Sequence, residues 1–287
     1  MATPKYTYKG VDVSNIIQGG TYSTTNNDKF VGFPTGTTTS YSDEIISIPG
    51  FNYNTSGTTL PTTAAVTISG SGTLDLHDYS QTIASMNSTS TSSVITNNGS
   101  ANNVTLSITG SSPGSFAGVI KNGSSKNIAL TLNSAGTFTL TNANTYTGTT
   151  TITAGTLALT GSGAIASSSS VAANGTFNIS GVTTSASIVT LSGSGTTTLG
   201  GKLLTITNGS TTFSGAMNGT SGQLTISGGT ETLSGNNGYT GATTINSGAT
   251  LALSTAGAIA SSSSVAANGT FDISAVTTSA SIVTLSG

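Results

Sequence analysis

The sequence predicts an all-β fold, a β-solenoid with a small, non-repetitive, β-rich head at its N-terminus. Three observations predict it: apolar residues alternate with small polar ones over short segments, Gly, Asn and Ser separate these segments, and a unit of about 94 residues recurs. Alternation with a period of two indicates a strand with one face inward. Recurrence of such units indicates that neighbours stack to close a common core.

The first 64 residues differ in composition from the rest and contain no internal repeat. They hold four of the five Pro, five of the eight Tyr and seven of the fourteen charged residues. We therefore expect a head or cap over residues 1–64 and a solenoid over residues 65–287. Within the head, Glu44–Ile48 is predicted to form a strand between turn residues.

The solenoid region contains many short alternating segments, and Thr, Val and Ile in them favour a pleated surface. Gly and Asn between them accept the left-handed turn conformation. The segments are Val104–Ile108, Ile128–Leu132, Thr137–Leu140, Leu157–Leu159 and Leu224–Ile226. Coils of about 20–25 residues predict about ten stacked coils. Inward Ser, Thr and Asn are expected to stack in hydrogen-bonded ladders.

Fourteen residues occur twice, letter for letter, at Ala164–Phe177 and at Ala258–Phe271. The match extends to either side, and Tyr146 and Tyr239 occupy the same repeat position 93 residues apart. An earlier, diverged copy begins at Gly72–Met86. A solenoid grows by copying coils, because a copied coil already fits its neighbour.

Several phrases recur in a constant order, among them TNANTYTGTTTITAGTLAL at Thr141–Leu159, SGNNGYTGATTINSGATLAL at Ser234–Leu253 and FSGAMNG at Phe213–Gly219. Together they resemble the autotransporter-associated β-strand repeat, or passenger-associated transport repeat, of bacterial type V secretion passenger domains. The resemblance covers about residues 65–287. It implies a right-handed parallel β-helix that is displayed outside the cell as a stalk or adhesive surface.

Passengers of this family carry a signal peptide and a C-terminal membrane barrel, and the sequence shows neither. The N-terminal segment has Lys5 and Lys9 but not the apolar core of a Sec signal peptide. No apolar run approaches the roughly 18 residues of a transmembrane helix. A virion or phage fibre is therefore the alternative to a protein of the bacterial surface.

The charge content excludes nucleic-acid binding driven by electrostatics. Charged residues make up 5% of the chain, the net charge is −2, and the six basic residues are dispersed Lys. No cluster of cations is present to displace the counterions of a phosphate backbone. The chain has no Cys, so a disulfide or a thiolate metal site is excluded as well.

Groups able to carry chemistry are few. His77 is the single His and lies between Asp75 and Asp78, a grouping that a metal site or an acid–base pair would use. Asp75, however, aligns with Asn178 of the next copy, so a structural role is expected. A carbohydrate-processing β-helix enzyme, the other alternative, needs a close carboxylate pair. Beyond the head the carboxylates number only four, Asp75, Asp78, Glu231 and Asp272, so we expect no enzyme, cofactor or metal.

One repeat position indicates which side of a strand faces water. The phrase GTFTL at Gly136–Leu140 matches GTETL at Gly229–Leu233, so Phe138 and Glu231 are equivalent. A position that accepts both residues is expected to face solvent.

The aromatic residues of the head are candidates for a contact surface, since exposed Tyr is favoured in interfaces. They are Tyr6, Tyr8, Tyr22, Phe30, Phe33, Tyr41, Phe51 and Tyr53. The alternative, which we favour, is the core of a cap over the first coil, because solenoid ends expose unpaired strand edges.

The sequence thus predicts a non-enzymatic extracellular structural or adhesive protein, a surface-displayed rod or fibre subunit. Its sparse charge gives little repulsion between copies, so lateral or end-to-end self-association is expected. A host surface or a glycan is the other expected partner.

Overall fold

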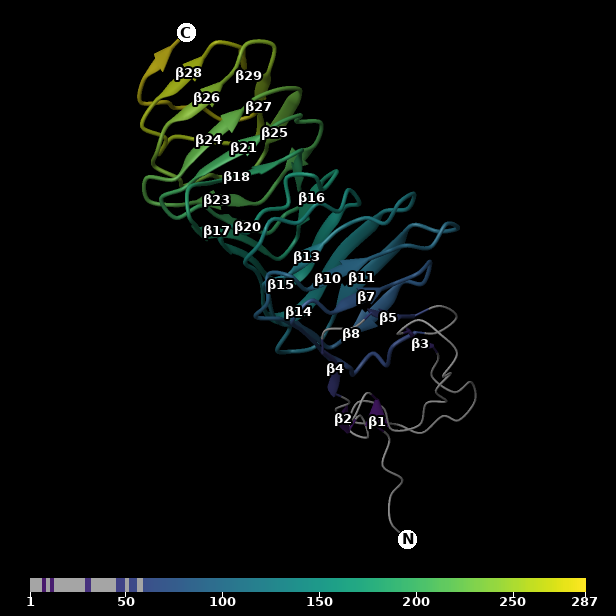
Figure 1. Ribbon diagram of the computed structural model, residues 1–287. Helices are drawn as coiled ribbons and strands as arrows, with labels where there is room; N and C mark the ends of the chain where they lie inside the picture. Colours follow the sequence, from purple (N-terminus) through teal and green to yellow (C-terminus); the bar gives the residue numbers. More distant parts are fainter. Residues whose placement is uncertain (1–6, 9–10, 13–28, 32–44, 50–51, 56–58) are drawn as a thin grey trace.

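The computed structural model describes residues 7–8, 11–12, 29–31, 45–49, 52–55 and 59–287, with side chains for Thr55 and from residue 59 on. The described residues form strands and turns without a helix. The strands stack as about 11 coils of a parallel β-solenoid. Figure 1 shows an elongated body with the C-terminal coils at one tip. The predicted all-β parallel β-helix is confirmed.

The strands gather into sheets that run along the body, with neighbours parallel in every sheet but one. Near the N-terminal end, one sheet contains β3 (Lys29–Val31), β5 (Asn52–Asn54), β7 (Thr73–Asp75), β10 (Val94–Thr96) and β13 (Val119–Ile120), and another contains β4 (Ile45–Pro49), β6 (Ala65–Ser69) and β9 (Ser85–Asn87). The exception is the antiparallel pair β1 (Thr7–Tyr8) and β2 (Val11–Asp12).

The largest sheet occupies the middle of the body (Figure 1). It contains β8 (Gln81–Ile83), β11 (Val104–Ile108), β12 (Gly114–Phe116), β14 (Ile128–Leu140), β15 (Thr150–Gly161), β16 (Val171–Ala173), β17 (Thr176–Val182), β19 (Leu191–Ser192), β20 (Thr196–Thr198) and β23 (Ala216–Asn218).

Two further sheets form the C-terminal half. One contains β18 (Ser185–Ile188), β21 (Leu203–Ile206), β24 (Gln223–Ile226), β26 (Thr243–Ile245), β28 (Val265–Ala267) and β30 (Leu285–Ser286). The other contains β22 (Thr212–Phe213), β25 (Thr230–Leu233), β27 (Thr250–Thr255) and β29 (Thr270–Val276).

Local alternation placed these strands correctly. Each alternating segment singled out in the sequence lies within a strand: β11, β14, β15 or β24, and the predicted strand at Glu44–Ile48 corresponds to β4. In β11 the apolar residues Val104, Leu106 and Ile108 are buried, and the polar residues between them are partly exposed. The period-two pattern therefore reports the inward face of each strand.

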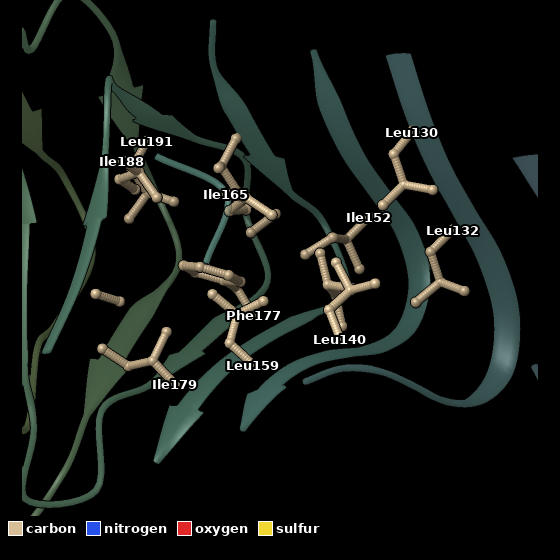
Figure 2. Packing of buried hydrophobic residues seen from close by; sticks show 14 of the residues in the cluster. Leu130, Leu132, Leu140, Ile152, Leu159, Ile165, Phe177, Ile179, Ile188 and Leu191 are labelled. Carbon is tan, nitrogen blue, oxygen red and sulfur yellow. The ribbon is translucent and has the colours of Figure 1, made fainter. Parts of the chain in front are cut away.

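In the C-terminal half, paired residues of successive coils lie 18 to 22 residues apart, most often 20. Phe177 pairs with Thr197 and Thr197 with Met217, each one coil further on. Apolar side chains from successive coils meet in the interior, as Figure 2 shows for Leu140, Leu159 and Phe177. Since burial of apolar area is the main driving force of folding, this continuous core holds the coils together.

The repeat unit is not a whole number of coils, so its second copy is rotated about the solenoid axis. Leu253 is the counterpart of Leu159. Leu159 stacks on Leu140, whereas Leu253 belongs to a different column, which includes Leu132, Ile152, Ala173, Gly193, Phe213, Leu233 and Leu253. The same repeat positions therefore face different sides of the rod in the two copies.

The parallel ladder extends into the predicted head. Strand β4 pairs with β6 and β5 pairs with β7, both in parallel register. The division at residue 64 stays a prediction, and the ladder shows only that residues 45–54 contribute strands to it.

Candidate functional site

A hydrogen-bonded network inside the rod uses the residues that the two repeat copies share. In the first copy the Tyr146 hydroxyl lies 2.7 Å from the Thr150 hydroxyl, which lies 2.8 Å from the Ser168 hydroxyl. Ser168 donates to the carbonyl oxygen of Gly148 at 2.9 Å. All three side chains are fully buried. The chain of hydroxyls ends on a backbone acceptor and leaves no polar group unpaired.

The second copy reproduces this network. The Tyr239 and Thr243 hydroxyls lie 2.7 Å apart, Thr243 and Ser262 2.9 Å, and Ser262 donates to Gly241 at 2.9 Å. The two networks match because residues at identical repeat positions supply them. The expectation of inward polar ladders is confirmed in this form.

A buried Asn stands beside each Tyr and binds three backbone groups. The Asn144 side-chain oxygen accepts from the Ile120 N–H at 2.9 Å, and its amide donates to the carbonyls of Asn142 and Ala164. Asn237 makes the equivalent bonds in the second copy. One side chain thus joins three successive coils, which strengthens the stack without any exposed contact.

These interior groups are unsuited to acid–base chemistry. Burial raises the pKa of both Tyr146 and Tyr239 above the ordinary phenol range, so both hydroxyls stay protonated. The repetition of Tyr146 at Tyr239 was evident in the sequence, whereas the network of hydroxyls was not predicted. In both copies Asn, Tyr, Gly and Thr occupy every second position, and this spacing is the signal in the sequence that indicates the network.

The structure contradicts the expectation that Phe138 and Glu231 face water. Both side chains are fully buried. Glu231 lies in β25, where it pairs with Leu251 of the next coil, and the Thr190 hydroxyl lies 2.9 Å from its Oε2. A Phe and a Glu share this inward position because the hydroxyls beneath Glu231 accommodate its carboxyl group. Glu231 is therefore a buried titratable group, and the prediction from the sequence that it faces solvent is wrong.

The carboxylates around His77 bind backbone groups. Asp78 accepts the N–H groups of Ser100, Ala101 and Asn102 at 2.8–3.0 Å. These donors, Asn102 foremost, hold the pKa of Asp78 below its ordinary value. His77 and Asp78 both have positive φ, 39° and 72°, so they form a left-handed turn.

Asp75 is engaged in the same way. Its Oδ1 accepts from the N–H groups of His77 at 3.1 Å and Asn98 at 2.9 Å. The two carboxylates therefore anchor the corner of the next coil. Within residues 59–287 and the described parts of the head, no three His, Cys, Asp or Glu side chains gather as a metal site would require. The same residues include no helix long and apolar enough to span a membrane.

The candidate contact surface of the head lies largely outside the described residues. Tyr6, Tyr22, Phe33, Tyr41 and Phe51 are not among them. Strands β1, β3 and β5 contain Tyr8, Phe30 and Tyr53, of which the structure describes the backbone alone. The contact surface stays a prediction.

The C-terminal coil exposes apolar side chains whose counterparts in the first repeat copy are buried. Residues 269–287 repeat residues 175–193 with two differences, Asn178 to Asp272 and Gly181 to Ala275. Ile179 is fully buried in the first copy, where β20 and β21 belong to the next coil, whereas Ile273 is 47% exposed. Leu191 is likewise buried and Leu285 is 56% exposed. The same sequence therefore shows both a covered and an uncovered coil surface.

Comparison with known proteins agrees with this architecture. A family model, the passenger-associated-transport-repeat, matches residues 130–159 and 228–253. Searches of curated proteins and of solved structures gave no match. The first matched segment contains most of β14 and β15, and the second contains β25, β26 and part of β27. Both contain the Asn, Tyr and Thr of the interior network, which the two copies share. Two segments of the chain therefore match the passenger-associated-transport-repeat, the repeat type to which its sequence phrases are similar.

Proposed function

We propose that this protein is a non-enzymatic structural rod of the autotransporter passenger kind, displayed at the cell surface or secreted. The observation that carries this proposal is where the repeated residues lie. Tyr146, Thr150 and Asn144 and their counterparts point inward and bind each other or the backbone. A repeat that served a binding or catalytic site would place its shared polar groups on the surface.

The rotation of the second copy supports the same function. The counterparts Leu159 and Leu253 lie in different columns, so a surface motif copied with the repeat reaches another side of the rod. A flat binding surface for one ligand would need every copy of its motif on the same side of the rod. The matches to the passenger-associated repeat favour a bacterial passenger over a virion fibre. The scarcity of carboxylates beyond residue 64 disfavours a carbohydrate-processing enzyme.

Surface display is tested by labelling intact source cells with an antibody against the solenoid region. We expect labelling of unbroken cells and release of solenoid fragments by external protease. Signal only after cell lysis contradicts the proposal. A carbohydrate-degradation screen with the purified protein checks the enzyme alternative, for which we expect no turnover.

For partners we propose self-association of copies of the rod, lateral or end-to-end. Charged residues make up 5% of the chain, so two copies repel each other little. The parallel strand ladders run along the rod, which gives each copy a long surface for contact with another.

Self-association is tested by sedimentation velocity over a concentration series. We expect the sedimentation coefficient to rise with protein concentration, because copies with little charge repel each other weakly. A single monomer with the same sedimentation coefficient at every concentration contradicts the proposal.

A further inference from the structure

Glu231 is a carboxyl group in the interior of a protein that has almost no charge there. Its side chain is fully buried, and its Oε1 has no hydrogen-bond partner among the described residues. The equivalent position of the other copy holds Phe138, which is equally buried. A carboxyl group has therefore taken the place of an aromatic ring without leaving the core.

The hydrogens available around Glu231 show which protonation state the cluster needs. The Thr190 Oγ1 lies 2.9 Å from Glu231 Oε2 and 2.7 Å from Thr211 Oγ1. Thr211 donates to the carbonyl oxygen of Leu191 at 2.6 Å. These three contacts need three hydrogens, and two hydroxyls supply two. A protonated Glu231 supplies the third.

With that proton the cluster forms one directed chain. Glu231 donates to Thr190, Thr190 to Thr211, and Thr211 to Leu191, while Thr190 also accepts the Ser210 N–H at 3.1 Å. Every contact then has its hydrogen. If Glu231 ionises, Thr190 must donate to it, and either the contact between the hydroxyls or that to Leu191 loses its hydrogen.

No charge in the surroundings offsets ionisation of Glu231. The elements packed around it, β19, β22, β27 and the turn before β22, present Leu191, Thr211, Leu251, Thr190 and Ser210. None of these is charged. Hydrogen bonds from Thr190 and from backbone N–H groups favour the ionised form, but they offset only part of the effect of burial. Burial is the larger effect and raises the pKa of Glu231 from 4.5 to about 8.

We propose that Glu231 makes the rod pH-responsive. Its protonated carboxyl completes the hydroxyl chain across the coils of Thr190, Thr211 and Glu231, and loss of the proton weakens their stacking. The sign follows from linkage: the folded state holds a proton that the unfolded chain releases. The added stability is complete below pH 4.5 and is lost as the pH rises to about 8. Over that range the unfolding constant rises by up to tenfold per pH unit from this group.

The test measures urea unfolding from about pH 5 to about pH 9 for the parent chain, Glu231→Gln and Glu231→Phe. We expect stability to fall with rising pH in the parent and to fall less in both variants. Glu231→Phe restores the residue of the other copy and is the second variant should the carboxamide prevent folding. The control is Asp272→Asn, which also restores the other copy's residue but removes a partly exposed carboxylate of lowered pKa. It is expected to keep the parent's slope across this range.

A direct readout is the infrared carbonyl band of a protonated carboxylic acid. We expect this band at neutral pH in the parent chain and not in Glu231→Gln. Its absence from the parent, or equal pH slopes for the parent and both Glu231 variants, overturns the proposal.

Discussion

Replacing Tyr239 by Ala is expected to destabilise the C-terminal half of the rod by about 3–5 kcal/mol, because a buried aromatic ring leaves a cavity. Tyr239→Phe keeps the ring and loses one hydrogen bond, since Thr243 still bonds Ser262. That variant is expected to cost about 1 kcal/mol. Urea unfolding followed by far-UV circular dichroism measures both values.

The repeat supplies an internal control for this prediction. Tyr146 makes the same contacts in the first copy, so Tyr146→Phe should cost as much as Tyr239→Phe. Unequal costs would mean that the two networks are not energetically equivalent. A Phe variant as destabilised as the Ala variant would show that the hydrogen bond, rather than the ring, dominates.

The second large effect is expected at Gly215. It belongs to a column on one corner of the rod, Gly155, Gly175, Gly195, Gly215 and Gly235, in which successive members are one 20-residue coil apart. A Cβ at Gly215 would overlap the carbonyl oxygen of Gly195 and lie 2.6 Å from the Phe213 ring. Gly215→Ala must therefore displace backbone, and we expect a loss of about 1–3 kcal/mol.

Gly201→Ala is the matched control for this substitution. Gly201 is exposed, and the nearest atom to its added Cβ is the carbonyl oxygen of Thr220 at 3.6 Å. We expect no loss, and a gain of about 0.4–1 kcal/mol where the backbone suits Ala, through the lower entropy of the unfolded chain. Thermal and urea unfolding compare the two. Similar losses for both variants would show that the effect is one of Gly removal in general rather than of close coil contact.

Most of the secondary structure followed from local pattern. The alternation in Val104–Ile108 and Ile128–Leu132 predicted strands β11 and β14, since period two is a property of a few neighbouring residues. The stacked fold followed as well, because copied units with one apolar side must bury it against each other. The repeat phrases also indicated the family whose model matches two segments.

The candidate site followed from the sequence only in part. The recurrence of Tyr146 at Tyr239 was visible in the sequence. The bond of each Tyr to a Thr four residues on, and of that Thr to a Ser of the next coil, was not. Which hydroxyls lie within hydrogen-bond distance depends on the length of each coil. The sequence of neither copy reveals that length. Ile273 is exposed and its counterpart Ile179 is buried. This difference could not be predicted either, because the two residues have nearly the same sequence around them.

By itself the sequence determined the strand segments, the parallel stacking and the repeat type, because alternation, turn residues and recurrence act locally or between copies. The tertiary structure alone decided the interior place of Glu231 and the rotation of the second copy. The physical reason is that the repeat of about 94 residues is not a whole number of coils, since coils are 18 to 22 residues long. That mismatch sets which coils lie beside each residue, and so places the Glu231 carboxyl group next to the hydroxyls of Thr190 and Thr211.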